Sequence, residues 1–124
     1  MRALLDTHVL IWWARDEKLT TAARAAIQDG DTEVLVSAAS IWEAEIKAAA
    51  GKLELSPDLF GDVRGHGFRE LSIDVDHAIE AARLPMHHPD PFDRMLIAQA
   101  RLEGLVLLTR DPAFRAYDVQ LLDA

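Results

Sequence analysis

The chain of 124 residues is 50% hydrophobic and 27% charged, which predicts a single globular domain over residues 1–124. It contains no cysteine, which excludes disulfides and thiolate metal sites. Its longest apolar run, Val9 to Ala14, is too short to span a membrane, and no signal-peptide pattern opens it, so we expect a cytoplasmic protein without a membrane partner. The formal net charge of −8 argues against a nucleic-acid binder, except that bound divalent cations would invert the local sign.

The first half of the chain alternates short apolar runs with helical patterns. In order, it predicts a strand over Arg2–Leu5, a helix over Thr20–Gln28 that ends near Gly30, a strand over Glu33–Val36, an alanine-rich helix over Ala38–Ala50 and a weaker helix over 56–66.

The second half continues the alternation. It predicts a strand over Glu70–Ile73, helices over Val75–Arg83 and Pro91–Glu103, a buried strand over Leu105–Thr109 and a last strand over Val119–Leu122. Strands alternating with helices predict a three-layer α/β/α fold with a five-stranded parallel sheet and right-handed crossovers. In such sheets the working site lies beyond the carboxyl ends of the strands.

Four aspartates stand at those ends or at a helix start. Asp6 follows the first strand in "LLDTH", Asp111 follows the fourth, and Asp90 and Asp93 open the helix "DPFDRMLIAQA". Each also has a purely structural interpretation. Asp6 could cap a helix from Thr7, Asp111 could start a turn with Pro112, and Asp90 could be an N-cap with Asp93 facing the helix dipole.

Taken together, the carboxylates would converge on one side of the sheet. Clustered carboxylates repel and would partly protonate unless a cation joins them. Oxygen ligands without cysteine favour Mg²⁺ or Mn²⁺. Such a site suits phosphodiester hydrolysis by an activated water.

Four segments carry a resemblance to a known family: "LLDTH", "SAASIWEAEIKAAAGKLEL", "HHPDPFDRMLIAQA" and "LLTRDPAF". In this order they resemble PIN-domain proteins, and more closely the VapC-type toxins of bacterial toxin–antitoxin pairs. The resemblance implies a PIN-like fold with the first and fourth strands adjacent at the centre. It also implies a Mg²⁺-dependent endoribonuclease that cuts RNA, a protein antitoxin that inhibits it, and a homodimer.

The resemblance also implies a set of site residues. Asp6 and Asp93 are expected to be the principal metal ligands, Glu43 and Asp111 to complete the catalytic and metal-binding set, and Asp90 to support it. Helical periodicity does not choose between Glu43 and Glu45. On the helical wheel an apolar stripe is formed by Ala38, Trp42, Ile46 and Ala49, and Glu43 lies at its edge. The alternative to a role in the site is that Glu43 forms an ion pair with Lys47 on the surface of the helix.

Residues beside these acids have weaker interpretations. Thr109 could orient a ligand, and Arg94 and Arg110 could contact a phosphate or pair with the acids. We interpret His87 and His88 as loop residues. His8 follows Asp6 closely and could lie near the site, although we favour loop packing for it. Trp12 and Trp13, with Leu10 and Ile11, form an apolar patch that we expect to be mostly core, with one tryptophan available to an interface. We expect an antitoxin with an apolar helix to bind at this patch and to carry a basic side chain to the carboxylates.

Two functions of other classes remain open from the sequence. One is a catalytically silent PIN-like binding module, against which the intact acidic set counts. The other is a different acidic-site protein, such as a phosphohydrolase or a receiver domain. The phosphohydrolase needs a second aspartate two residues after the first, where this chain has His8, and the receiver needs a lysine where it has Arg110.

Overall fold

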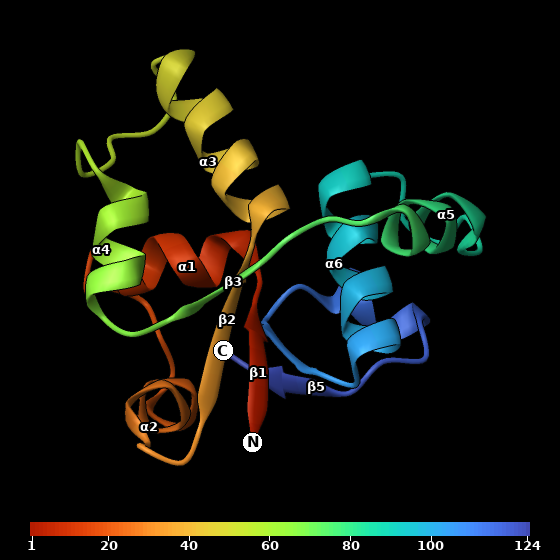
Figure 1. Cartoon of the computed structure of the whole chain (residues 1–124), viewed down its shortest axis with the longest axis horizontal. Coiled ribbons are helices and arrows are strands. Elements are labelled where there is room, and N and C mark those ends of the chain that lie inside the picture. The colour runs from red at the N-terminus through yellow and green to blue at the C-terminus, as the bar shows by residue number, and fades with distance from the viewer.

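The structure, a computed structural model describing residues 1–124, contains five strands, six α-helices and one 3₁₀ helix (Figure 1). In chain order these are β1 (Arg2–Leu5), α1 (Thr7–Ala14), α2 (Thr21–Gln28), β2 (Glu33–Ser37), α3 (Ala38–Ala49), α4 (Leu59–Gly65), β3 (Arg69–Leu71), α5 (Val75–Arg83), α6 (Pro91–Glu103), β4 (Val106–Thr109), η1 (Pro112–Ala116) and β5 (Leu121–Asp123).

All five strands run parallel in one sheet with the order β3-β2-β1-β4-β5. Leu4 of β1 is in register with Leu35 of β2 on one side and with Leu107 of β4 on the other. The expected parallel sheet, with the first and fourth strands adjacent at its centre, is confirmed. The strand order reverses between β1 and β4, so a site is expected beyond the carboxyl ends of these two strands.

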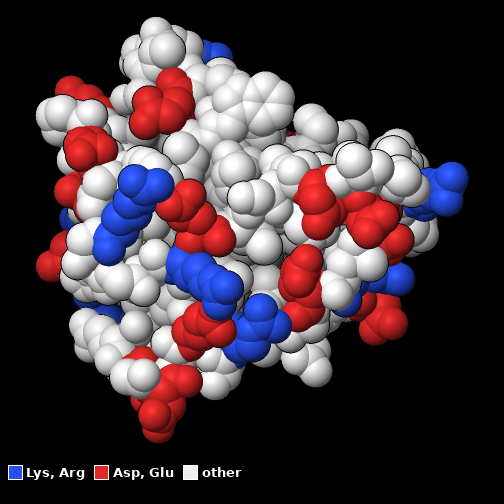
Figure 2. Space-filling view, viewed as in Figure 1, with Lys and Arg blue, Asp and Glu red and all other residues white.

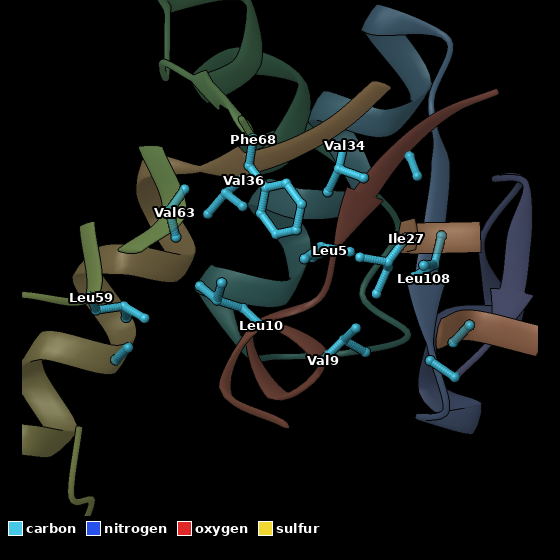
Figure 3. Close-up of a cluster of buried hydrophobic side chains, with 14 residues drawn as sticks. Leu5, Val9, Leu10, Ile27, Val34, Val36, Leu59, Val63, Phe68 and Leu108 are labelled. Atoms are coloured by element: carbon cyan, nitrogen blue, oxygen red, sulfur yellow. The ribbon is translucent and has the colours of Figure 1, made fainter. Parts of the chain in front are cut away.

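The sheet is buried on both faces, which explains the unbroken apolar strands. Successive residues of a strand point to opposite faces, and β1 divides accordingly. Ala3 and Leu5 join a core cluster that α1, α2 and α4 cover, whereas Leu4 joins a second cluster beneath α6 and η1. Figure 3 shows the first cluster, and Figure 1 shows α1 and α4 on one side of the central strands and α5 and α6 on the other.

Local signals place most element ends. The Asp90 side chain accepts hydrogen bonds from the backbone N–H groups of Phe92 and Asp93 at the start of α6, and Gly104 ends that helix with a φ of 67°. The weak pattern over 56–66 becomes the shorter α4, which Asp58 caps.

Two strands are displaced from their predicted positions because pairing, not hydropathy, sets their bounds. β3 covers Arg69–Leu71 instead of Glu70–Ile73, since its partner β2 ends at Ser37, opposite Leu71. β5 covers Leu121–Asp123 instead of Val119–Leu122, since it pairs with residues 107–109 of β4.

None of the helices combines the length and the hydrophobicity needed to cross a membrane.

Candidate active site

The candidate site lies at the carboxyl edge of the sheet. Asp6 directly follows β1, and Asp111 lies two residues beyond the end of β4. Helix α3 begins where β2 ends and packs against both α1 and α6, so its inner face overlooks the same edge (Figure 1). The fold therefore brings together four segments that are far apart in the sequence.

Asp6 is buried, and its carboxylate does not cap the helix that follows it. The side chain makes no cap hydrogen bond to α1. Its Oδ2 accepts a hydrogen bond from the Thr109 hydroxyl at 2.7 Å, while its Oδ1 has no partner. Burial raises the pKa of Asp6 above its ordinary value of 3.8, against the hydrogen bond from Thr109 and the charge of the exposed His8. The capping interpretation of Asp6 is wrong.

Glu43 faces the interior, whereas Glu45 is exposed to solvent. Glu43 is only 7% exposed; its Oε2 pairs with the Lys47 ammonium at 3.0 Å, and its Oε1 has no partner. The predicted pair with Lys47 therefore exists, but on a buried carboxylate. Ala39, Ser40 and Ala44 share this buried face of α3.

The apolar stripe predicted on this helix is turned to solvent. Trp42 is 61% exposed and Ile46 is 45% exposed, and Ala38 and Ala49 are exposed as well. The small side chains on the opposite face let α3 approach its neighbours closely, and that contact decides which face is buried.

Asp93 carries the clearest sign that the carboxylates have converged. Burial raises its pKa from 3.8 to about 6, a hydrogen bond with His88 lowers it, and the charges of Asp6, Asp90 and Glu43 raise it. Asp93 stands at the third position of α6 without capping it, because Asp90 does that. Asp90 thus has the capping role that its position predicted, and it adds a negative charge near Asp93.

Asp111 combines a turn with a place at the site. Its Oδ1 accepts a hydrogen bond from the Ala113 N–H at 2.9 Å, which is the predicted turn. Its carboxylate also lies close to the Asp93 carboxylate and the His88 ring, and one ligand atom from each of the three residues lies within 4.8 Å of the others. The Thr109 hydroxyl connects two residues of the site, because it donates a hydrogen bond to the Asp6 carboxylate and accepts one from the Asp111 N–H at 3.1 Å.

His88 is the site residue that the sequence interpretation missed. Its Nε2 lies 2.7 Å from Asp93 Oδ2. The ring of the neighbouring His87 packs on Tyr117 instead. The signal available in the sequence was the short spacing from His88 to the helix start at Asp90, but adjacent histidines gave no reason to choose one.

The two arginines beside the acids do not contact them. Arg94 is 6% exposed and donates to backbone carbonyls, among them those of Ala81 and Leu84 at 2.9 Å. Arg110 donates to the carbonyls of Lys18 and Ala124. The expectation that either arginine pairs with the acids is wrong, because both guanidinium groups hold chain segments in place.

The apolar patch predicted at Leu10–Trp13 is largely closed. Leu10 and Ile11 are buried. Trp12 lies under the Arg110 guanidinium, 4.0 Å from the ring centre, and Trp13 packs against His66 and Phe68.

The exposed apolar surface lies on α3 instead, and Figure 2 shows a mostly uncharged area there. Beside Trp42 is an open pocket of about 430 Å³, lined mainly by apolar side chains that include Ile41, Phe60 and Leu71.

These residues fit a metal ion. Asp6 Oδ1 and Glu43 Oε1 are the two buried side-chain atoms of the chain without a hydrogen-bond partner. A buried carboxylate oxygen without a partner is costly. A hard divalent cation is a partner that such oxygens accept, and its positive charge would oppose the carboxylate repulsion that adds to burial in raising the pKa of Asp93.

Comparison with known proteins gives a consistent result. A family model described as "PIN domain" matches residues 3–120. The chain is 33% identical over 118 residues to Ribonuclease VapC22 of Mycobacterium tuberculosis. The aligned residues make up 92% of this chain and 90% of that protein.

Solved structures share the fold. A chain of VapBC2 from Rickettsia felis, bound to a DNA fragment from its promoter, superposes with a TM-score of 0.76 at 11% identity, covering 100% of this chain and 99% of that one. DNA-bound VapBC from Salmonella typhimurium gives 0.72 at 18% identity, covering 99% and 98%. A toxin–antitoxin complex from Klebsiella pneumoniae gives 0.69 at 20% identity, covering 97% and 95%.

Proposed function

The chain belongs to the PIN-domain family and to its VapC-type members, and from this we propose that it is a metal-dependent endoribonuclease, the toxin of a toxin–antitoxin pair. The name of its relative, Ribonuclease VapC22, supports nuclease activity. Cleavage of RNA and inhibition by an antitoxin would both take place in the cytoplasm.

One observation carries the proposal. Two buried carboxylates, Asp6 and Glu43, each present an oxygen without a partner, and both raise the pKa of a third carboxylate, Asp93. A fold that needed these groups only for stability would have paired them. Their arrangement is unfavourable for the isolated protein and favourable for a protein that binds a cation.

We propose that Asp6 and Asp93 are the main ligands of Mg²⁺, or of Mn²⁺, and that Glu43 and Asp111 complete the site. When bound, the cation supplies the positive charge that activates a water and stabilises the leaving oxygen of a phosphodiester. A carboxylate set without nitrogen or sulfur ligands favours these hard ions.

The protein's own groups prepare the site for this reaction. Thr109 donates to Asp6 Oδ2 and leaves Oδ1 without a partner, so that oxygen remains available to a cation. Asp90 fixes the first turn of α6 and with it the backbone of Asp93. Lys47 neutralises one oxygen of Glu43 and leaves the other free. Binding a polyanionic RNA at an edge this acidic requires the cation to reverse the local charge.

A cleavage assay tests the activity. We expect the purified protein to cut single-stranded RNA with Mg²⁺ and to stop when chelator is added, and we expect Asp6→Asn to be inactive with an unchanged fold. The control is Glu45→Gln, which changes an exposed carboxylate on the same helix and should cut normally. Cleavage that persists in chelator, or in Asp6→Asn, would contradict the proposal.

A melting experiment tests the metal without relying on activity. Ligand linkage predicts a stabilisation of about 2.7 kcal/mol when the free cation is at one hundred times its dissociation constant. A melting temperature unmoved by millimolar Mg²⁺ or Mn²⁺ would count against the shared metal site.

We propose that the antitoxin contacts the exposed face of α3 and not the closed Leu10–Trp13 patch. Trp42, Ile46 and the adjoining pocket form an apolar surface beside an acidic site. This combination suits an apolar helix that carries a basic side chain, preferably arginine, toward the carboxylates. Co-expression with a neighbouring small gene should yield a stable complex, and failure to co-purify together with undiminished toxicity would refute it.

We propose a homodimer through α5. Val75 is 73% exposed and Ile79, one turn further along the helix, is 42% exposed; Met86 beyond the helix is 75% exposed. Light scattering of the free protein should give twice the chain mass, and Val75→Glu should give the monomer. A monomeric wild-type protein would refute the dimer.

A further inference from the structure

His88 makes a direct and short contact with the candidate metal site. Its Nε2 lies 2.7 Å from Asp93 Oδ2, and the two side chains are only 17% and 15% exposed. The hydrogen bond occupies one oxygen of the Asp93 carboxylate, and the other oxygen makes no hydrogen bond. His88 therefore fixes the rotation of a carboxylate that a helix start alone would leave free to turn.

The loop that carries His88 is held by a partly buried network of hydrogen bonds. The backbone N–H groups of His87 and His88 both donate to the Tyr117 hydroxyl, at 3.2 and 2.9 Å. That hydroxyl in turn donates to the Pro85 carbonyl at 2.7 Å. The Arg94 guanidinium donates to the carbonyls of Pro85 and His88, at 3.1 and 3.2 Å.

This network explains the buried Arg94. The guanidinium is next in sequence to Asp93, yet it does not neutralise that carboxylate. The guanidinium donates hydrogen bonds to the carbonyls of the loop and so holds the His88 imidazole against Asp93. A rigid loop is what a residue needs in order to orient another residue.

The contact also indicates which role His88 has. As a metal ligand Asp93 is ionised, and an ionised carboxylate only accepts hydrogen bonds, so the 2.7 Å contact in that state requires the proton on Nε2. A nitrogen that carries a proton cannot bind a metal ion through the same atom. His88 therefore lies outside the ligand set, although its ring nitrogen lies near Asp93 and Asp111.

We propose that His88 is a positioning residue, which acts on the cation only by holding the Asp93 carboxylate in its ligand orientation. The proposal rests on the metal site of the proposed function. Partners that orient ligating carboxylates are worth about 10- to 100-fold in metal affinity.

Three variants separate this role from simpler ones. His88→Leu removes the donor, whereas His88→Gln places an amide N–H close to the position of Nε2. His87→Leu is the matched control, because it removes the neighbouring ring, which contacts Tyr117 and no acid of the site. All three are first compared by thermal melting in chelator to establish that they fold.

The dissociation constant of Mn²⁺, measured by electron paramagnetic resonance, is the main readout. We expect His88→Leu to weaken binding about 10- to 100-fold, His88→Gln to restore it to within a few-fold of wild type, and His87→Leu to leave it unchanged. Bound Mn²⁺ should show no ¹⁴N coupling from a histidine in the wild type.

Each other outcome overturns the proposal. A ¹⁴N coupling that His88→Leu abolishes would make His88 a ligand. Unchanged Mn²⁺ affinity in His88→Leu, with normal binding by the wild type, would remove the positioning role and leave the metal site intact. A wild-type protein that binds no Mn²⁺ would overturn the metal site, and the role of His88 with it.

Discussion

Replacing Asp93 with asparagine removes one negative charge from the candidate site and preserves the shape of the side chain. In the wild type, the pKa of Asp93 is about 6 in the folded protein, against an ordinary value of 3.8. The folded state therefore holds the proton more tightly than the unfolded chain. Stability from this group is fully present below about pH 4 and is lost as the pH rises through 6.

The size of this loss follows from the difference in pKa. One pKa unit corresponds to about 1.36 kcal/mol, so the ionised carboxylate would cost at most about 3 kcal/mol at pH 7.5. Asp93 keeps some contact with solvent, with 15% of its side chain exposed. Solvent screening reduces the expected cost to about 1–2 kcal/mol.

We therefore expect opposite effects of Asp93→Asn with and without metal. In chelator, the free energy of unfolding of the wild type should fall by about 1–2 kcal/mol more than that of the variant as the pH rises from 4.5 to 7.5. With saturating Mg²⁺ at pH 7.5, the wild type should gain stability that the variant largely lacks. RNA cleavage by the variant should fall by orders of magnitude.

Urea denaturation at a series of pH values, in chelator and in Mg²⁺, measures both effects. The charge of Asp6 raises the pKa of Asp93, so the difference between the two curves reports the loss of the Asp93 carboxylate together with the loss of its repulsion with Asp6. Parallel pH curves in chelator would refute the charge repulsion at this site. Near wild-type cleavage by Asp93→Asn would return this carboxylate to the role of a helix-start residue.

Substitutions at four other positions test neighbouring contacts. Asp6→Asn should leave the metal-free protein as stable as the wild type or more so, because it removes a buried charge; a clear loss of stability in a urea titration would contradict this. Thr109→Val should cost about 1–3 kcal/mol in the same titration, because Asp6 loses its hydroxyl donor; a cost below about 0.5 kcal/mol would show that the hydrogen bond is unimportant. Asp90→Asn should melt like the wild type, whereas Asp90→Ala should lose about 1 kcal/mol as the N-cap is removed; equal melting of the two would argue against the cap. Trp42→Ser should retain RNA cleavage and lose capture of the co-expressed antitoxin in a pull-down, and retained capture would move the antitoxin elsewhere.

The sequence determined the fold class and most of its elements. Apolar strands alternating with helical patterns predicted the parallel sheet, and local signals such as the N-cap Asp90 and the stop at Gly104 predicted the ends of α6. These features are local, because caps and helix stops act within a few residues of the backbone they control. Strand ends were less accurate, since pairing with a neighbouring strand sets them.

Only the tertiary structure decided which way the functional side chains face. Periodicity assigned an apolar stripe to α3, yet packing against α1 and α6 buries the face with Glu43 and exposes Trp42. The same holds for Arg94, which donates to the Ala81 carbonyl of α5, and for the loop of His88, which the distant Tyr117 hydroxyl holds in place. A helix pattern states that one face is buried, but the neighbours it packs against choose that face, and those neighbours are set by contacts distant in sequence.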